Sequence, residues 1–377
     1  MRRKHCRSSR WRSSRGFTLL ELLAAAALFS VLGVLLFQMV RSAMDVWATG
    51  ERNRELADRA NSAFELLATD LRDAWAGTPG TALPGALLCT WRPEDDDKDG
   101  EPERRIPLLR FTRLCHEQAG LEWLARAGDV AGGQESVAGL QPQDPTTLRP
   151  TGGLAESLYT LAARAGAPLP ALLRVVHTPA GGERSLLDPE LEQQKERLLS
   201  DAAPAADDVL YFGVEFWGPG TTAWGPDGRC YTAWDSTRGI IPPADEGFPF
   251  GVGPASRADS SDDIWPRLVR LTLVLDRAGG ATGSGTLSEA AGAEAKAITV
   301  ADASFLRDEE APDHVLIDDE WLAVSSIDGR TLQVQRGARG TVAAVHGERA
   351  RVRTGRTFRR VLALSAGREL LVEGATR

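Results

Sequence analysis

Residues 15–21 read Arg15-Gly16-Phe17-Thr18-Leu19-Leu20-Glu21, and apolar sequence continues from there to Val40. Between Phe17 and Val40 the only ionisable side chain is that of Glu21. A helix over these residues, at about 1.5 Å per residue, would be roughly 36 Å long, which is enough to cross the hydrocarbon core of a bilayer. The stretch therefore predicts a membrane-spanning helix near the amino terminus.

The segment before this helix carries only positive charge. Its basic residues are Arg2, Arg3, Lys4, Arg7, Arg10, Arg12 and Arg15. By the positive-inside tendency, the basic end stays in the cytoplasm and the remainder of the chain is exported. A secretory signal peptide would have a shorter apolar core with a small-residue cleavage site after it. The pattern therefore favours a single-pass anchor that carries an exported body.

Glu21 is unusual in this position, because a carboxylate inside a membrane helix is costly on insertion scales. Cleavage between Gly16 and Phe17 would create an α-amino group one helical turn from Glu21. That amino group could neutralise the carboxylate, either within the subunit or from a neighbour in a helical assembly. The alternative is an ordinary membrane anchor that contains a glutamate by chance.

The stretch Gly16 to Glu21, with its basic leader and its apolar continuation, resembles the class III signal of type IV pilins and of type II secretion pseudopilins. The resemblance implies cleavage after Gly16 by a prepilin peptidase, N-methylation of Phe17, and a pairing role for Glu21 in filament assembly. It also implies a single-pass protein of the bacterial inner membrane. The amino terminus would then be cytoplasmic and the carboxy-terminal body periplasmic.

Residues 1–16 are thus the predicted leader, and the remaining chain is acidic. Of 44 basic residues, seven lie in the leader, so 37 remain against 52 acidic ones, a net charge of −15. An acidic exported body argues against nucleic-acid binding, which needs a basic face.

The predicted helix continues beyond the membrane and covers residues 17–76. Its apolar positions recur in steps of three and four, as in an amphipathic helix. They are Leu56, Ala60, Ala63, Phe64, Leu67, Leu71, Ala74 and Trp75. Gly77 and Pro79 end the pattern. The second half of the helix should therefore pack under a β domain.

Short apolar and β-branched runs predict a β body over residues 81–275, interrupted by a Gly-, Ala- and Pro-rich insertion near 126–170. The predicted strands are 86–91, 106–111, 172–176, 209–217 and 265–275. This order, with Trp224 and Trp234 in a loop before a strand that begins Trp265-Pro266, resembles minor pseudopilin J of type II secretion (the GspJ/PulJ family). The usual strand of that family begins Leu-Pro.

That resemblance implies an α+β, pilin-like fold, in which a long N-terminal helix packs on an antiparallel β-sheet body. It also implies a structural role in initiating or capping the pseudopilus, with other minor and major pseudopilins as partners. A minor type IV pilin of the PilW kind, used in adhesion or DNA uptake, is the close alternative. A pilin-anchored module that binds a ligand is the more distant one.

The carboxy-terminal third is predicted as a linker over 276–300, a small β module over 301–356, and a last strand with a tail over 357–377. Asp328-Gly329 between two apolar runs is a hairpin signal. The module also contains Arg336-Gly337-Ala338-Arg339-Gly340-Thr341, followed by His346. This pattern loosely resembles small β modules of phage-tail-like proteins and lies outside the usual pseudopilin J pattern.

An acidic run between the first two predicted strands is a candidate calcium loop. Asp95, Asp97 and Asp99 with Gly100 match the D-x-D-x-D-G opening of such loops. The twelfth position is Ile106, not glutamate, so Glu101 or Glu103 would have to complete the set. The alternative is a solvated acidic hairpin loop. Calcium is the one cofactor that the sequence suggests.

Three cysteines, Cys89, Cys115 and Cys230, remain after leader removal, and an odd number in an oxidising compartment allows one disulfide. We predict the pair Cys89–Cys115, with three buried thiols as the alternative. The five histidines are widely separated, and the common catalytic motifs are absent from the sequence. The sequence therefore predicts a protein that is not an enzyme.

Overall fold

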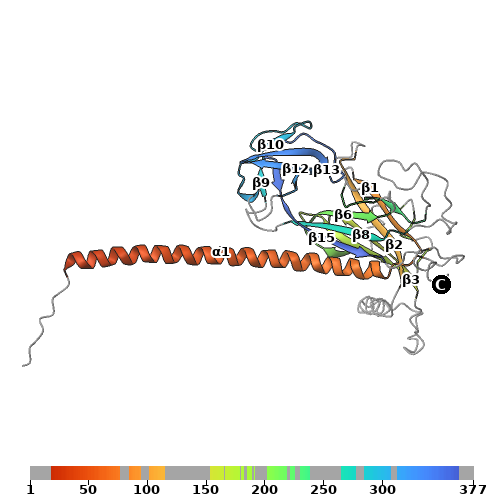
Figure 1. Cartoon of the computed structure of the whole chain (residues 1–377), viewed down its shortest axis with the longest axis horizontal. Helices are drawn as coiled ribbons and strands as arrows, with labels where there is room; N and C mark the ends of the chain where they lie inside the picture. Colours follow the sequence, from red (N-terminus) through yellow and green to blue (C-terminus); the bar gives the residue numbers. More distant parts are fainter. Residues whose placement is uncertain are drawn as a thin grey trace, which may run out of the picture. The chain divides into compact units, whose positions relative to one another are not determined.

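The computed structural model describes residues 18–76, 85–94, 102–114, 153–164, 166–178, 180–181, 185–188, 191, 202–218, 221–225, 230–237, 265–276, 284–306 and 312–364. Within this range the chain has an α+β, pilin-like fold, in which one long N-terminal helix accompanies antiparallel sheets (Figure 1). The chain divides into two compact units, Met1–Glu55 and Leu56–Arg377.

Helix α1 runs from Leu19 to Arg72 and contributes to both units. In the first unit its apolar side chains are exposed, and by length and composition this helix could cross a membrane. In the second unit the buried residues of the helix are Leu56, Ala60, Ala63, Phe64, Leu67, Ala68, Asp70 and Leu71. The predicted amphipathic spacing is confirmed, and the helix ends a few residues before the predicted position 76.

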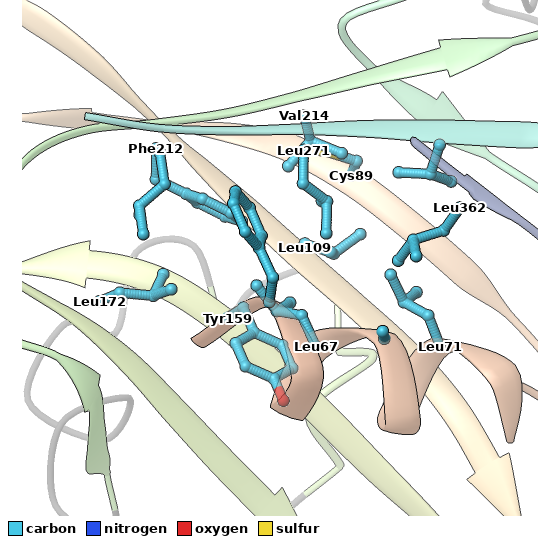
Figure 2. Close-up of a cluster of buried hydrophobic side chains, with 14 of the residues drawn as sticks. Leu67, Leu71, Cys89, Leu109, Tyr159, Leu172, Phe212, Val214, Leu271 and Leu362 are labelled. Atoms are coloured by element: carbon cyan, nitrogen blue, oxygen red, sulfur yellow. The ribbon is translucent and has the colours of Figure 1, made fainter. Parts of the chain in front are cut away.

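The buried stripe of α1 packs against two sheets of the body. The larger has the strand order β5-β4-β3-β2-β1-β7, and the smaller has the order β15-β8-β6. Figure 2 shows Leu67 and Leu71 of the helix in one cluster with Leu109, Tyr159 and Leu271. Strands of both sheets contribute to this cluster, so helix and sheets share one hydrophobic core.

All pairings in the two body sheets are antiparallel. The strands of the larger sheet are β1 (Leu87–Glu94), β2 (Arg104–Leu114), β3 (Leu154–Ala162), β4 (Ala171–His177), β5 (Ala203–Ala206) and β7 (Trp234–Asp235). Those of the smaller sheet are β6 (Val209–Trp217), β8 (Leu268–Asp276) and β15 (Gly355–Ala363). Strand β3 lies within the predicted insertion. It is buried along almost its whole length, so its sequence lacks the alternation that marks a half-exposed strand.

A third sheet, with the order β10-β13-β12-β11-β14-β9, forms the small β module. Its strands are β9 (Ser284–Thr286), β10 (Ala297–Thr299), β11 (His314–Ile317), β12 (Glu320–Asp328), β13 (Thr331–Ala338) and β14 (Arg351–Arg353), and the 3-10 helix η3 covers Ser304–Leu306. The predicted hairpin at Asp328-Gly329 is confirmed, because Asp328 pairs with Thr331 and Gly329 has a φ of 59°.

The predicted linker over 276–300 is corrected by the structure, since β9 and β10 belong to the module sheet. The small residues of this stretch form short strands that depend on pairing with β13 and β14 rather than on local propensity. The module is an insertion in a hairpin of the body. Asp276 at the end of β8 pairs directly with Gly355 at the start of β15.

Candidate assembly and ligand surfaces

The described part of helix α1 begins with a reciprocal cap. The Thr18 amide donates to Glu21 Oε2 at 3.0 Å, and the Glu21 amide donates to Thr18 Oγ1 at 3.2 Å. The Thr18 hydroxyl also donates to Glu21 Oε2, at 3.2 Å. This is a capping box, in which the third helical residue satisfies the amide of the cap residue. The T-x-x-E spacing could have predicted it from sequence.

Glu21 therefore has a second role that sequence analysis missed. All the hydrogen bonds it accepts within the described chain are on Oε2. A carboxylate offers about four acceptor positions, so Oε1 remains available for an additional donor. Gly16 and Phe17, the predicted processing residues, lie outside the described residues.

The first unit of the helix exposes a continuous apolar surface. Its large exposed side chains are Leu19, Leu20, Leu22, Leu23, Leu28, Phe29, Val31, Leu32, Val34, Leu35, Leu36, Phe37, Met39, Val40, Met44, Val46 and Trp47. Exposure of an apolar surface of this size to water is unfavourable. Such a surface marks a contact with a membrane or with another protein. The surface can pack against lipid or against other apolar helices.

Asp70 connects the second half of the helix to the larger sheet. It is 2% exposed, and its carboxylate accepts two bonds from Arg174, at 2.7 and 2.9 Å. The Tyr159 hydroxyl donates to the same carboxylate at 2.6 Å, and Arg113 Nε lies 3.6 Å from it. Burial and the charge of Asp70 raise the pKa of Tyr159 well above its ordinary value. The carboxylate therefore fixes the rotation of the helix against β3 and β4.

A second buried carboxylate, Glu320, organises the module. Arg336 donates to it at 2.8 and 2.6 Å, and the amides of Gly337 and Ala344 donate at 2.9 and 3.0 Å. His346 Nε2 lies 2.8 Å from Glu320 Oε2. Arg336, Gly337 and His346 belong to the sequence pattern noted above. The loop that contains this pattern therefore surrounds the carboxylate of Glu320.

The histidine of this cluster also contacts a second acid. His346 Nδ1 lies 2.9 Å from Asp318 Oδ2, while the histidine itself is only 1% exposed. Burial would lower the pKa of His346, but its bonds to Glu320 and Asp318 outweigh burial and raise it. Because Glu320 and His346 are both buried and hydrogen-bonded, we interpret this cluster as structural rather than catalytic.

The module docks on the β1–β2 hairpin of the body through backbone and side-chain contacts. The Arg105 amide donates to Gly340 O at 3.0 Å, and the Val342 amide donates to Glu103 O at 2.8 Å. Arg104 and Asp319 form an ion pair at 3.2 Å. Next to these contacts lies a cavity of about 320 Å³.

Of the predicted cysteine pair, Cys89 carries a free, buried thiol, and burial raises its pKa to about 12. The structure therefore does not support the predicted disulfide, although Cys115 itself lies outside the described residues. Cys89 faces the apolar core from the middle of β1, where a small apolar side chain is accommodated.

The predicted calcium ligands Asp95, Asp97, Asp99 and Glu101 all lie outside the described residues. The structure shows the strands on either side of them, with β1 ending at Glu94 and β2 beginning at Arg104. Within the described part of the chain, no group of three or more His, Cys, Asp or Glu side chains is placed to hold a metal ion. The calcium site stays a prediction.

Residues 11–37 match the family model of the prokaryotic N-terminal methylation motif. No curated protein matches the chain. The match covers the end of the predicted leader, the predicted cleavage position and most of the apolar run of α1. It implies processing by a prepilin peptidase and assembly with other pilin-like subunits, and it agrees with a single-pass inner-membrane protein. The chain therefore carries a prepilin-type amino terminus, the class III signal of type IV pilin-like proteins.

Proposed function

We propose that this protein is a minor pseudopilin, similar to pseudopilin J, which helps to initiate or cap the pseudopilus of type II secretion. The observation that carries the proposal is the methylation motif over residues 11–37, joined to a helix whose first unit exposes apolar side chains. A subunit of this kind would leave the bilayer by exchanging lipid contacts for contacts with neighbouring helices. Its folded body would remain in the periplasm.

Glu21 would direct this assembly. After cleavage, the methylated α-amine of Phe17 would carry a positive charge close to the Glu21 carboxylate. Oε2 already caps the helix, so Oε1 would receive the amine of the same or of a neighbouring subunit. Charge pairing in an apolar surrounding is strong when the geometry is fixed. A subunit with this carboxylate packs beneath another one, so we do not place it at the outermost tip.

A minor type IV pilin, active in adhesion or DNA uptake, is the alternative that shares the same amino terminus. The inserted module favours a third candidate, in which the pilin anchor displays a binding domain. The module has its own hydrophobic core, and it interrupts the β8–β15 hairpin between Asp276 and Gly355. An added function could be carried by such an insertion without disturbing the pilin body.

We further propose that the chain is not an enzyme, and that calcium binds at Asp95, Asp97 and Asp99 with Glu101. Calcium prefers several carboxylate and carbonyl oxygens in a flexible loop, which this composition supplies. Titration of the purified protein with calcium tests the site, with Asp97→Asn as the variant. Binding that is equal in the variant and the wild type would overturn it.

The first experiment is intact-mass and amino-terminal analysis of the membrane-extracted protein, with and without the prepilin peptidase. We expect a chain that starts at methylated Phe17 only when the peptidase is present. A chain that starts at Met1 in both samples would contradict the predicted cleavage signal, and with it the proposed assembly function.

Deletion of the gene then separates secretion from pilus function. Loss of secreted proteins with normal pili supports the pseudopilin, and the reverse result supports the type IV pilin. Replacement of residues 277–354 by Asn-Gly tests the display role, because a two-residue turn can join β8 directly to β15. If secretion continues and ligand binding is lost, the module is a binding domain that the pilin anchor displays. If secretion stops while the body remains folded, the module belongs to the assembly.

A further inference from the structure

The cavity beside the docked module has an arginine-rich lining. Its wall includes Arg105 of β2, Arg351 of β14, and Arg339, which follows β13. Arg104 and Arg353 also line it, but they pair with carboxylates, Arg104 with Glu94 and Asp319, and Arg353 with Asp276. Arg105, Arg339 and Arg351 form no ion pair with a carboxylate of the described chain. The lining thus includes three arginines without a carboxylate partner in the described chain, in a protein whose net charge is negative.

Arg339 is the most unusual of the three. Its guanidinium lies against two aromatic rings, 4.5 Å from the centroid of Tyr211 and 4.3 Å from that of Trp321. Its Nη1 is buried and has no hydrogen-bond partner in the described part of the chain. Burial lowers the pKa of Arg339 to about 10, so the side chain remains charged at neutral pH. The π faces of the two rings attract the cation but accept no conventional hydrogen bond from its N–H groups.

The backbone at this position is also strained. Arg339 has a φ of 54°, between Gly337 at 65° and Gly340 at 82°. A non-glycine residue rarely adopts this conformation, and strain of this kind collects at functional sites. The side chain lies against Tyr211 of the body and Trp321 of the module, whose rings are 6.0 Å apart. The fold therefore maintains a half-buried, incompletely hydrogen-bonded cation next to a cavity.

The remaining lining contains three carboxylates, Glu94, Asp318 and Asp319, each of which pairs with a basic side chain, and an apolar portion. Leu210, Leu316 and Trp321 contribute to the apolar portion, and Leu210 and Trp321 belong to a small buried cluster that joins body and module. A volume of about 320 Å³ falls within the range of about 300–1,000 Å³ that is usual for small-molecule sites. The lining offers arginine donors for an anionic group and an apolar surface for a planar or apolar portion of the same ligand.

We propose that this cavity is a binding site for a small oxyanion ligand, a carboxylate or phosphate with an apolar portion, held by Arg339, Arg105 and Arg351. Arginine binds both groups through paired N–H donors, so the shared chemistry does not depend on which anion is present. The proposal is independent of the role in secretion, because it concerns the body and the module alone.

Isothermal titration of the full chain in detergent tests the site with four probes. Benzoate and phenyl phosphate carry the predicted anion and an apolar ring, benzamide is the neutral control, and inorganic phosphate lacks the ring. We expect benzoate or phenyl phosphate to bind at least tenfold more tightly than benzamide. The tighter of the two identifies the anion. Equal binding of both anions and benzamide would overturn the proposal.

Substitutions locate the binding. Arg105→Gln and Arg351→Gln alter exposed side chains, so the fold should be unaffected. Each should weaken binding of the preferred probe about tenfold, as expected for loss of one charge-assisted hydrogen bond. Arg349→Gln is the matched control, because Arg349 is exposed on the same module and does not line the cavity. Wild-type affinity in both test variants, or an equal loss in the control, would place the binding elsewhere.

Discussion

At the scale of single residues, two buried carboxylates hold the second unit together. Asp70 accepts hydrogen bonds from Arg174 and Tyr159, and Glu320 accepts them from Arg336, His346 and the module backbone. A buried pair contributes little net stability compared with an apolar pair of the same shape. Its main effect is on specificity, because removal of one partner leaves the other charge buried and uncompensated.

We therefore expect Asp70→Asn to destabilise the body by about 3–5 kcal/mol, the usual cost of breaking a buried ion pair. Arg174 and Arg113 would lose their negative partner in a low-dielectric site. Urea denaturation of the full chain measures this. The control is Glu65→Gln in the same helix. Glu65 pairs with Arg360 at an exposed site, where less than about 1 kcal/mol is expected. Similar effects of the two substitutions would contradict the anchoring role of Asp70.

The lowered pKa of Glu320 predicts that the stability of the fold depends on pH. Burial alone would raise its pKa, but hydrogen bonds from Arg336, His346 and two backbone amides lower it from the ordinary 4.5 to about 2. The carboxylate therefore stabilises the fold above pH 4.5, and this contribution is lost as the pH falls towards 2. The loss corresponds to about 3 kcal/mol.

Unfolding of wild type and Glu320→Gln at a series of pH values checks this prediction. The variant should be less stable at pH 7, and the difference between the two proteins should shrink below pH 4.5. His346 contributes with the opposite sign. Its raised pKa stabilises the fold below the ordinary value of 6.5, and that contribution is lost as the pH rises through the folded pKa. A difference that stays constant from pH 7 to pH 3 would exclude the role of Glu320.

At the scale of elements, helix α1 has two functions along one continuous helix. Leu67 in the second unit is fully buried, whereas Leu35 in the first unit is 56% exposed. Leu67→Ala should lower the stability of the body by about 2–5 kcal/mol, because it removes apolar contacts and leaves a cavity. Denaturant unfolding of the full chain measures the change.

Leu35→Ala is the matched substitution in the same helix. It should leave the unfolding of the body unchanged and reduce lateral assembly, since it removes apolar area only from the exposed surface. Crosslinking of neighbouring subunits in membranes reports the assembly. A body destabilised as strongly by Leu35→Ala as by Leu67→Ala would contradict this division of the helix.

At the scale of the whole molecule, the amino-terminal charge pair should control assembly without affecting the fold. Glu21→Gln retains an acceptor for the Thr18 amide, so the cap and the helix should persist. It removes the negative charge that would meet the amine of Phe17. We expect normal cleavage, membrane insertion and body stability, with loss of co-purification with other pilin-like subunits. Normal co-purification of the variant would show that helix packing alone drives assembly.

Features that depend on neighbouring residues in the chain could be predicted from the sequence alone. The basic leader, Gly16-Phe17 and Glu21 indicated the prepilin-type signal, which the methylation-motif match confirms. Steps of three and four from Leu56 to Leu71 predicted the buried helix face, because helical periodicity is set by the backbone. The hairpin at Gly329 followed from turn chemistry, since a left-handed residue there favours glycine.

Features that depend on residues far apart in the chain became visible in the folded structure. Strand β3 is buried along most of its length, so no alternation marked it. The strands β9 and β10 exist through pairing with β13 and β14, which local composition does not encode. Asp70 lies one position before Leu71 in the helix, and its partners Tyr159 and Arg174 come from β3 and β4. The cation–ring contact of Arg339 likewise depends on Tyr211, which is 128 positions away in the chain. The periodicity of apolar residues predicts which face of a helix or strand is buried. Which residues contact that face depends on how the helices and strands pack against one another.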